Sequence, residues 1–473
     1  MHNEILHNYI TTRMSQLFVP SLTLAVMKEG KIIREEAYGF RDLENSLKAT
    51  PDTIYEIASI TKVFTATAIM QLVEKGKISL DDPAEKYLPI ELRVKGEPVR
   101  IWHLLSHTSG IPALGYAEAQ ISSYMGQSPD WLPYSEPIHV LRWLEEGSRK
   151  WAIATPGERF FYLNEGFVAL GFIIEKVSGI SYFDYIKKNI IEPLKLERTK
   201  PSYYDTIDNP LLAKPYDNTR KPPKLSRIPG TIYADGGIYS SSPDLARFMQ
   251  VLARGGNLEG KQILGQKYVR EMEKPRTKLP FQLFGNDSYG LGLIIYDSVF
   301  DEKVIGHSGS VLAYTGYAGY ISSRLLSIGV LSNANAMPRD IALNALALEL
   351  NKDPYELPFN KAEKLYSILE GIYYGYKGTL KVEVDRKGDY LIINPKDPSE
   401  ESIILEPDFD IKQINLGDQM TLLFKSRMNG GFINIEFKID QLKDVIELIY
   451  ERNRFVKVAS LDISRPSLSA IRF

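Results

Sequence analysis

The sequence lacks cysteine and carries almost no net charge. Its 473 residues include no cysteine, and 57 Lys and Arg face 59 Asp and Glu, a formal charge of −2. The absence of cysteine excludes disulfides, thiolate metal sites and a cysteine nucleophile. The charge balance excludes the concentrated positive field that nucleic-acid binding requires, so we expect no nucleic-acid partner. Any covalent catalysis must therefore use another nucleophile.

Long apolar runs are also missing. No run approaches the roughly 18 to 20 residues that a membrane-spanning helix needs, so we expect no membrane partner. The first residues, Met1 to Tyr9, show neither the basic start nor the apolar stretch of an export signal, and a cytoplasmic location is the expectation. With 44% hydrophobic and 25% charged residues, the composition is that of a globular protein.

The sequence changes character after about residue 350. Residues 1–350 mix helical periodicity with extended apolar runs and end in an Ala- and Leu-rich segment, which predicts a closing helix. Residues 351–361 contain two prolines and are predicted to be a linker. Residues 362–473 include runs with period-two alternation, such as 380–385 and 432–439, separated by glycines. We therefore predict an α/β (α+β) domain followed by a small antiparallel β-barrel-like domain.

Ser59 and Lys62 form a Ser-x-x-Lys motif at the start of a predicted helix that ends at Gly76. A serine at a helix start lies near unpaired N–H groups and the positive end of the peptide dipole, which favour an anion there. Lys62 lies about one turn further on the same face, where its amine could take the hydroxyl proton. Burial would favour this, because it disfavours the charged form of an amine. The alternative is an ordinary N-cap serine followed by a solvated lysine.

Further segments follow the same order as in a known family. They are residues 53–65 around Ser59, residues 101–111, the stretch from Thr155-Pro156-Gly157 to Tyr162-Leu163-Asn164, residues 234–240, and Gly306-His307-Ser308-Gly309. With these segments residues 10–335 resemble the serine β-lactamase and penicillin-binding-protein superfamily, in particular its class C-like, CubicO-type branch of esterases, D-aminopeptidases and DD-peptidases. The resemblance implies an antiparallel sheet flanked by helices, with a helical insert.

The resemblance also implies roles for individual residues. Ser59 would be the acylated nucleophile, Lys62 would activate it, and Tyr162 would share the proton transfer, provided that a nearby cation stabilises its anion. Asn164 would orient Lys62 and bind the substrate. Tyr216-Asp217-Asn218 is a second Tyr-x-Asn, but the Pro-Gly turn before Tyr162 and the Gly-Phe after it favour Tyr162.

The resemblance places the segment 307–310 at the site as well. By the resemblance, the backbone N–H groups of Ser59 and Ser310 would make an oxyanion hole, with Ser308 and Gly309 beside the substrate. Gly309 would let the strand approach the substrate closely. His307 stands where family β-lactamases carry lysine. We expect it to bind a substrate carboxylate only when protonated, so that such activity declines between pH 5 and 8. A lone strand histidine satisfied by its neighbours is the alternative.

The C-terminal residues resemble the lipocalin-like domain of some CubicO-type peptidases, where it can cover the active-site cleft. The expected substrate is a short peptide, including peptides with D-residues, or a carboxylic ester; β-lactam hydrolysis is a weaker alternative. No cofactor and no metal are expected. The sequence is compatible with a homo-oligomer but gives no oligomeric state.

Three other classes of protein are alternatives. A metal hydrolase would use His103 and His107, four residues apart, but Leu104 stands where a zincin needs glutamate. An α/β-hydrolase would need Gly-x-Ser-x-Gly, and the segment 306–310 ends in serine. A non-catalytic binding protein with the same fold would normally have lost Ser59, Lys62 or Tyr162, and all are present.

Overall fold

The computed structural model describes residues 2–119, 136–219, 221–226, 232–311, 313–388, 390–395, 402–414, 417, 419–428, 431–450 and 452–458. The chain divides into two compact units, Met1–Lys352 and Asp353–Phe473. The residues predicted as a linker include the 3-10 helix η5 (Pro354–Glu356) and the start of helix α12 (Pro358–Leu369). Each unit has its own apolar core.

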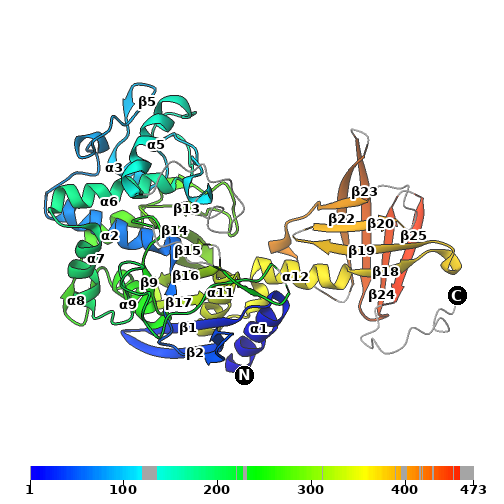
Figure 1. The fold of residues 1–473 in the computed structure, drawn as a ribbon. Helices are drawn as coiled ribbons and strands as arrows, with labels where there is room; N and C mark the ends of the chain where they lie inside the picture. Colours follow the sequence, from blue (N-terminus) through cyan, green and yellow to red (C-terminus); the bar gives the residue numbers. More distant parts are fainter. Residues whose placement is uncertain are drawn as a thin grey trace. The chain divides into compact units, whose positions relative to one another are not determined.

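A nine-stranded antiparallel sheet forms the frame of the first unit, with the strand order β12-β13-β14-β15-β16-β17-β1-β2-β3 (Figure 1). All residues of β16 and β17 are buried, as expected for strands covered on both faces. The strands of this sheet are β1 (Ser21–Lys28), β2 (Lys31–Asp42), β3 (Leu47–Lys48), β12 (Thr277–Lys278), β13 (Ser288–Tyr289), β14 (Ile294–Val299), β15 (Glu302–Val311), β16 (Tyr314–Ile321) and β17 (Leu326–Ser332).

Helices flank this sheet, and the mixed architecture with an antiparallel sheet confirms the predicted fold class. They are α1 (His2–Leu17), α2 (Thr61–Glu74), α3 (Ile101–Leu105), α5 (Pro137–Lys150), α6 (Asn164–Ser178), α7 (Tyr182–Ile186), α8 (Glu192–Leu194), α9 (Ser242–Ala253), α10 (Gln266–Met272) and α11 (Pro338–Glu349). Helix α2 ends just before Gly76, whose φ of +66° is the left-handed conformation typical of a helix C-terminus. No single helix in the described ranges is long and apolar enough to span a bilayer, although the bent pair Asn164–Ser178 and Tyr182–Leu194 passes this test of length and composition together.

Short ladders and turns connect the larger elements of the first unit. One of them, β4 (Tyr55–Glu56) paired with β9 (Tyr239–Ser240), directly precedes the Ser59 turn. The two-residue strands outside the nine-stranded sheet also include β5 (Arg93–Val94), β6 (Glu97–Pro98), β7 (Tyr216–Asp217), β8 (Lys224–Leu225), β10 (Asn257–Leu258) and β11 (Lys261–Gln262). The remaining helical turns are η1 (Ala58–Ile60), η2 (Ala84–Lys86), the π-helix η3 (Lys187–Ile191) and η4 (Ser322–Arg324).

The second unit is a closed eight-stranded antiparallel barrel, which confirms the predicted β-barrel-like domain (Figure 1). The alternating runs 380–385 and 432–439 lie mainly in β19 and in β23, with alternate residues buried. The strands are β18 (Gly371–Tyr374), β19 (Lys381–Lys387), β20 (Tyr390–Pro395), β21 (Ile403–Pro407), β22 (Gln419–Met428), β23 (Gly431–Asp440), β24 (Val445–Tyr450) and β25 (Asn453–Val458). The 3-10 helices η6 (Tyr376–Gly378) and η7 (Ile411–Gln413) join some of them.

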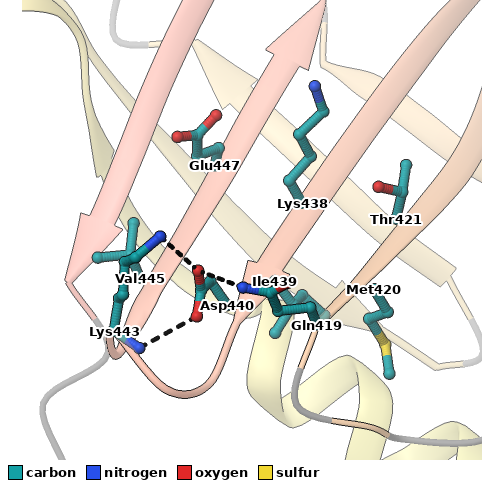
Figure 2. A pocket seen from close by; sticks show the side chains of 9 residues that line it. All are labelled: Gln419, Met420, Thr421, Lys438, Ile439, Asp440, Lys443, Val445 and Glu447. Carbon is teal, nitrogen blue, oxygen red and sulfur yellow. Dashed lines mark hydrogen bonds and ion pairs between the residues drawn. The ribbon is translucent and has the colours of Figure 1, made fainter.

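A shallow groove of about 660 Å³ lies on β22, β23 and β24, close to the turn between β23 and β24 (Figure 2). Each charged side chain of its lining has a partner: Asp440 accepts a hydrogen bond from Gln419 at 3.0 Å and lies 3.0 Å from the Lys443 ammonium. Lys438 pairs with Glu436 and Glu447 with Arg454, both outside the lining. None of the residues that the sequence predicted for catalysis lines this groove.

Candidate active site

Ser59 lies in the one-turn 3-10 helix η1, which continues directly into α2. The backbone just before it is in an unusual conformation, because Ala58 has a φ of +47°. A non-glycine residue in the left-handed region costs about 1 to 3 kcal/mol and persists only where surrounding structure holds it. The Ile57 N–H donates to Ile238 O at 2.9 Å and provides such a restraint. The turn therefore presents a half-buried serine at the start of a helix, as predicted.

Lys62 is fully buried and makes three short contacts through its amine. Its Nζ lies 3.0 Å from Ser59 Oγ, 2.8 Å from Asn164 Oδ1 and 2.7 Å from the backbone oxygen of Asp235. The amide and carbonyl oxygens can only accept, so Lys62 donates to both of them. The alternative of a solvated lysine is wrong, since the side chain has no exposed surface.

Tyr162 and Asn164 reach the same place from the segment that leads into α6. Asn164 is the first residue of that helix, and the Lys62 Nζ lies 5.0 Å from the centre of the Tyr162 ring and 5.5 Å from that of Phe167. The structure thus brings Ser59, Lys62, Tyr162 and Asn164 together.

The second Tyr-x-Asn has a different place. The Tyr216 hydroxyl donates to Glu44 at 2.5 Å and accepts from the Leu43 N–H at 2.8 Å. The Asn218 amide donates to Leu17 O at 2.7 Å. These contacts tie strand β7 and the residue after it to the turn at Leu43 and Glu44 and to the end of α1, which is a structural role.

Strand β15 runs past the Ser59 turn and carries the segment 307–310. Its pairing with β14 stops at Gly306, so within the described residues its edge from His307 to Val311 has no strand partner on that side. A Cβ at Gly309 would lie 2.1 Å from Ile57 O and 3.3 Å from the Cβ of Ala58. The glycine therefore allows contact between β15 and the backbone before Ser59, and its expected role beside the substrate stays a prediction. Ser308 is half-buried and Ser310 is exposed.

His307 is buried and engaged at both ring nitrogens. Because a carbonyl oxygen can only accept, Nδ1 carries the proton and donates to Ser308 O at 2.6 Å, and Nε2 accepts from the Tyr289 hydroxyl at 2.9 Å. Burial lowers the pKa of His307 to about 3. The expectation that His307 changes charge between pH 5 and 8 is therefore wrong, because the ring stays neutral throughout that range.

The alternative chemistries have no matching geometry in the described part of the chain. Helix α3 ends at Leu105, so His103 and His107 do not share a helical face, and no group of three or more His, Asp or Glu that could hold a metal occurs among the described residues. Ser308 lies inside β15 and not in the sharp strand-to-helix turn of an α/β-hydrolase.

Several residues of the site were not identified from the sequence. The backbone oxygen of Asp235 fixes Lys62, and its buried carboxylate accepts a short hydrogen bond from the Tyr116 hydroxyl. Burial raises the pKa of Asp235. Tyr289 holds His307, and the His107 ring packs 4.2 Å from the Tyr162 ring. Residues 234–240 were marked by the resemblance, but a backbone acceptor leaves no signal in the identity of a side chain.

Comparisons with known proteins agree with this geometry. The family model described as Beta-lactamase matches residues 6–352, and the model described as Pab87 octamerisation domain matches residues 354–456. The chain is 42% identical to a solved octameric penicillin-binding protein homologue from Pyrococcus abyssi, with a TM-score of 0.89 over 97% of this chain and 100% of that chain.

Two further relatives cover most of the chain. A D-stereospecific amidohydrolase from Streptomyces is 25% identical, with a TM-score of 0.58 over 72% of this chain and 98% of that chain. A penicillin-binding protein of Bacillus subtilis (strain 168) is 27% identical, covering 76% of this chain and 78% of the relative. The chain therefore belongs to the beta-lactamase family, whose members are serine hydrolases of the penicillin-binding-protein type.

Proposed function

We propose that this chain is a serine peptidase or amidase that acts on short peptides, including those with D-residues, through an ester between the substrate's acyl group and Ser59 Oγ. The observation that carries the proposal is the buried Lys62 amine, held 3.0 Å from Ser59 Oγ by two acceptors that do not take part in the reaction.

The hydrogen bonds of Lys62 suit it to activate the serine. A neutral amine has two N–H donors and one lone pair. Asn164 Oδ1 and the Asp235 carbonyl accept the two donors, so the lone pair faces the Ser59 hydroxyl and can take its proton as Oγ attacks the acyl carbon. The resulting ammonium keeps all three contacts, with Ser59 Oγ as its third acceptor.

Tyr162 is proposed to pass a proton to the leaving amine. The Lys62 ammonium, 5.0 Å from the centre of the Tyr162 ring, would stabilise a phenolate by direct charge attraction. Breaking an amide bond requires protonation of the leaving nitrogen, so this step matters more for peptides than for activated esters.

The oxyanion hole is proposed to consist of the backbone N–H groups of Ser59 and Ser310. Two features support this assignment: the edge of β15 from His307 onward is not paired with β14, and Gly309 allows β15 to lie against the backbone that precedes Ser59. Two fixed donors beside the acyl carbon would stabilise the tetrahedral intermediate by about 3 to 4 kcal/mol each.

The preference for peptide amides rests on His307 and on one relative. A neutral, buried His307 supplies no positive charge for a substrate carboxylate, unlike the lysine of family β-lactamases, which weakens the β-lactam alternative. The D-stereospecific amidohydrolase from Streptomyces supports an amide of a D-amino acid as the test substrate.

We also propose that the barrel assembles the chain into a homo-oligomer. The match of residues 354–456 to an octamerisation domain and the similarity to an octameric homologue over nearly the whole chain support this. Light scattering coupled to size-exclusion chromatography should give a mass several times 53.6 kDa. A monomeric mass across the micromolar range would refute this part of the proposal.

Intact-mass analysis tests the chemistry. A fluorophosphonate should add one adduct to the wild type and none to Ser59→Ala, with peptide mapping placing it on Ser59. The wild type should then hydrolyse a D-amino-acid amide, and comparison with a nitrophenyl ester and a β-lactam ranks the substrates. Labelling that persists in Ser59→Ala would refute the nucleophile, and hydrolysis of the ester alone would refute the amide preference.

A further inference from the structure

His107 holds the segment that carries Tyr162 from both sides. Its backbone oxygen accepts from the Phe161 N–H at 2.7 Å, and its ring nitrogen Nδ1 accepts from the Leu163 N–H at 3.0 Å. Between these two contacts the His107 ring packs on the Tyr162 ring, with the centroids 4.2 Å apart and the planes tilted by 33°. One residue therefore fixes the backbone before Tyr162, the backbone after it and the phenol ring.

The hydrogen bond to Leu163 determines the proton position on His107. A backbone N–H can only donate, so Nδ1 carries the lone pair and the neutral ring carries its proton on Nε2. The residue is 1% exposed, and burial keeps the pKa of His107 well below its usual range. The acceptor at Nδ1 is therefore present at every pH at which the enzyme would work.

The aromatic surroundings leave the ring little freedom. Besides Tyr162, three rings face His107, with centroids at 5.1 Å for Phe167, 4.9 Å for Tyr289 and 5.8 Å for Phe160. A rotation that moved Nδ1 away from Leu163 would disturb these contacts, so the acceptor stays in place.

The backbone of His107 indicates that this side chain is needed at its position. Its φ of +57° lies in the left-handed region, which glycine adopts without strain and other residues adopt at a cost of about 1 to 2 kcal/mol. A residue that served only the turn after α3 would be best replaced by glycine. The strain is tolerated where the Thr108 N–H donates to His103 O at 2.8 Å and the Gly157 N–H to Thr108 O at 2.7 Å.

We infer that His107 is a positioning residue for Tyr162, and that Nδ1 is the atom through which it acts. This inference rests on the proposed function, in which Tyr162 transfers a proton during acylation by Ser59. The inferred role, orientation of a phenol, differs from that of the metal ligand considered from the sequence.

Three variants of His107 distinguish the loss of the hydrogen-bond acceptor at Nδ1 from the loss of side-chain packing. In His107→Asn, the side-chain oxygen stands about where Nδ1 stood, and asparagine tolerates a positive φ better than most residues. In His107→Gln, the oxygen lies one bond further out, so a larger side chain presents its acceptor in the wrong place. His107→Ala removes the acceptor and the ring.

The readouts are kcat and KM for a D-amino-acid amide, measured well below the lowest melting temperature of the set. We expect His107→Asn to keep kcat within about 5-fold of wild type, and the Gln and Ala variants to lose about 50- to 100-fold with little change in KM, as for a misplacement of about 1 Å. A nitrophenyl ester, whose leaving group needs no proton, should show a smaller loss in all three variants.

The outcomes are distinguishable. Equal kcat for the Asn and Gln variants, or wild-type kcat in His107→Ala, would overturn the positioning role. The positioning role would also be overturned if the losses in kcat followed the melting temperatures of the variants and not the position of the acceptor. A wild type without labelling or turnover that depends on Ser59 would instead refute the proposed function itself.

Discussion

Substitution of Gly309 by alanine tests the geometry that joins β15 to the Ser59 turn. The added Cβ would lie 2.1 Å from the Ile57 oxygen and 3.1 Å from the Ile57 carbonyl carbon. Both are backbone atoms, so no side-chain rotation relieves the clash. The oxygen must retreat by more than about 1 Å to reach an ordinary van der Waals separation, and it belongs to the residue two positions before Ser59.

The substitution is expected to lower both the stability of the protein and the rate of acylation, by free energies of similar size. Overpacking of this kind costs about 1 to 3 kcal/mol of folding free energy. A shift of about 1 Å in the nucleophile relative to the N–H of Ser310 should slow acylation about 100-fold, which corresponds to about 2.7 kcal/mol in the barrier. The assay is the second-order rate of fluorophosphonate labelling, with thermal unfolding measured on the same samples.

Gly306→Ala is the matched control in the same strand. Its Cβ would meet the backbone oxygen of Ala318 in β16 at 2.2 Å, a clash of similar size that is directed at β16 and not at the Ser59 turn. We expect it to lower the melting temperature but to reduce labelling less than 10-fold, a smaller loss than the full 1 Å misplacement. Wild-type labelling in Gly309→Ala, or an equal loss in both variants, would refute the argument that Gly309 sets the position of Ser59.

Further predictions concern single side chains. Lys62→Met should lower kcat for a nitrophenyl ester by about 10²- to 10⁴-fold, the range for loss of a proton acceptor, and a loss below 10-fold would contradict the role of the amine. Tyr162→Phe should lower kcat for an amide at least about 100-fold and Tyr216→Phe hardly at all; similar values would contradict the assignment. Burial raises the pKa of Glu56 to about 8. Because an unfolded glutamate ionises near pH 4.5, the wild type should lose about 3 to 4 kcal/mol of unfolding free energy relative to Glu56→Gln between pH 5 and 8, and parallel urea-unfolding curves for the two proteins would contradict this. The pKa of His307 is lowered to about 3, so its stability contribution is complete above pH 6.5 and falls by about 1.4 kcal/mol per pH unit below it. His307→Gln should remove this acid slope without adding a pH dependence of rate between pH 5 and 8, and an unchanged slope would contradict the burial.

The residues that the sequence placed correctly share a local signal. The spacing of Ser59 and Lys62 at a helix start, and the alternation in residues 380–385 and 432–439, reflect hydrogen-bonding periodicities that repeat over a few residues. Strands with one polar and one apolar face follow from that alternation, whereas closure of the barrel depends on the pairing of β18 with β25.

Other properties of the site depended on atoms brought from distant parts of the chain. One acceptor of the Lys62 amine is the backbone oxygen of Asp235, 173 residues away, and the choice between Tyr162 and Tyr216 was decided by their neighbours. The charge state of His307 was mispredicted because the ordinary pKa of histidine assumes contact with water, whereas here Tyr289 and a carbonyl oxygen replace the solvent.

The sequence by itself determined which elements form and which side chains can do chemistry, because those properties belong to short stretches of chain. Only the tertiary structure decided which of these side chains meet, which protons they carry and which backbone segment packs against Gly309. Desolvation and contact between residues far apart in sequence are properties of the packed molecule, and no local periodicity encodes them.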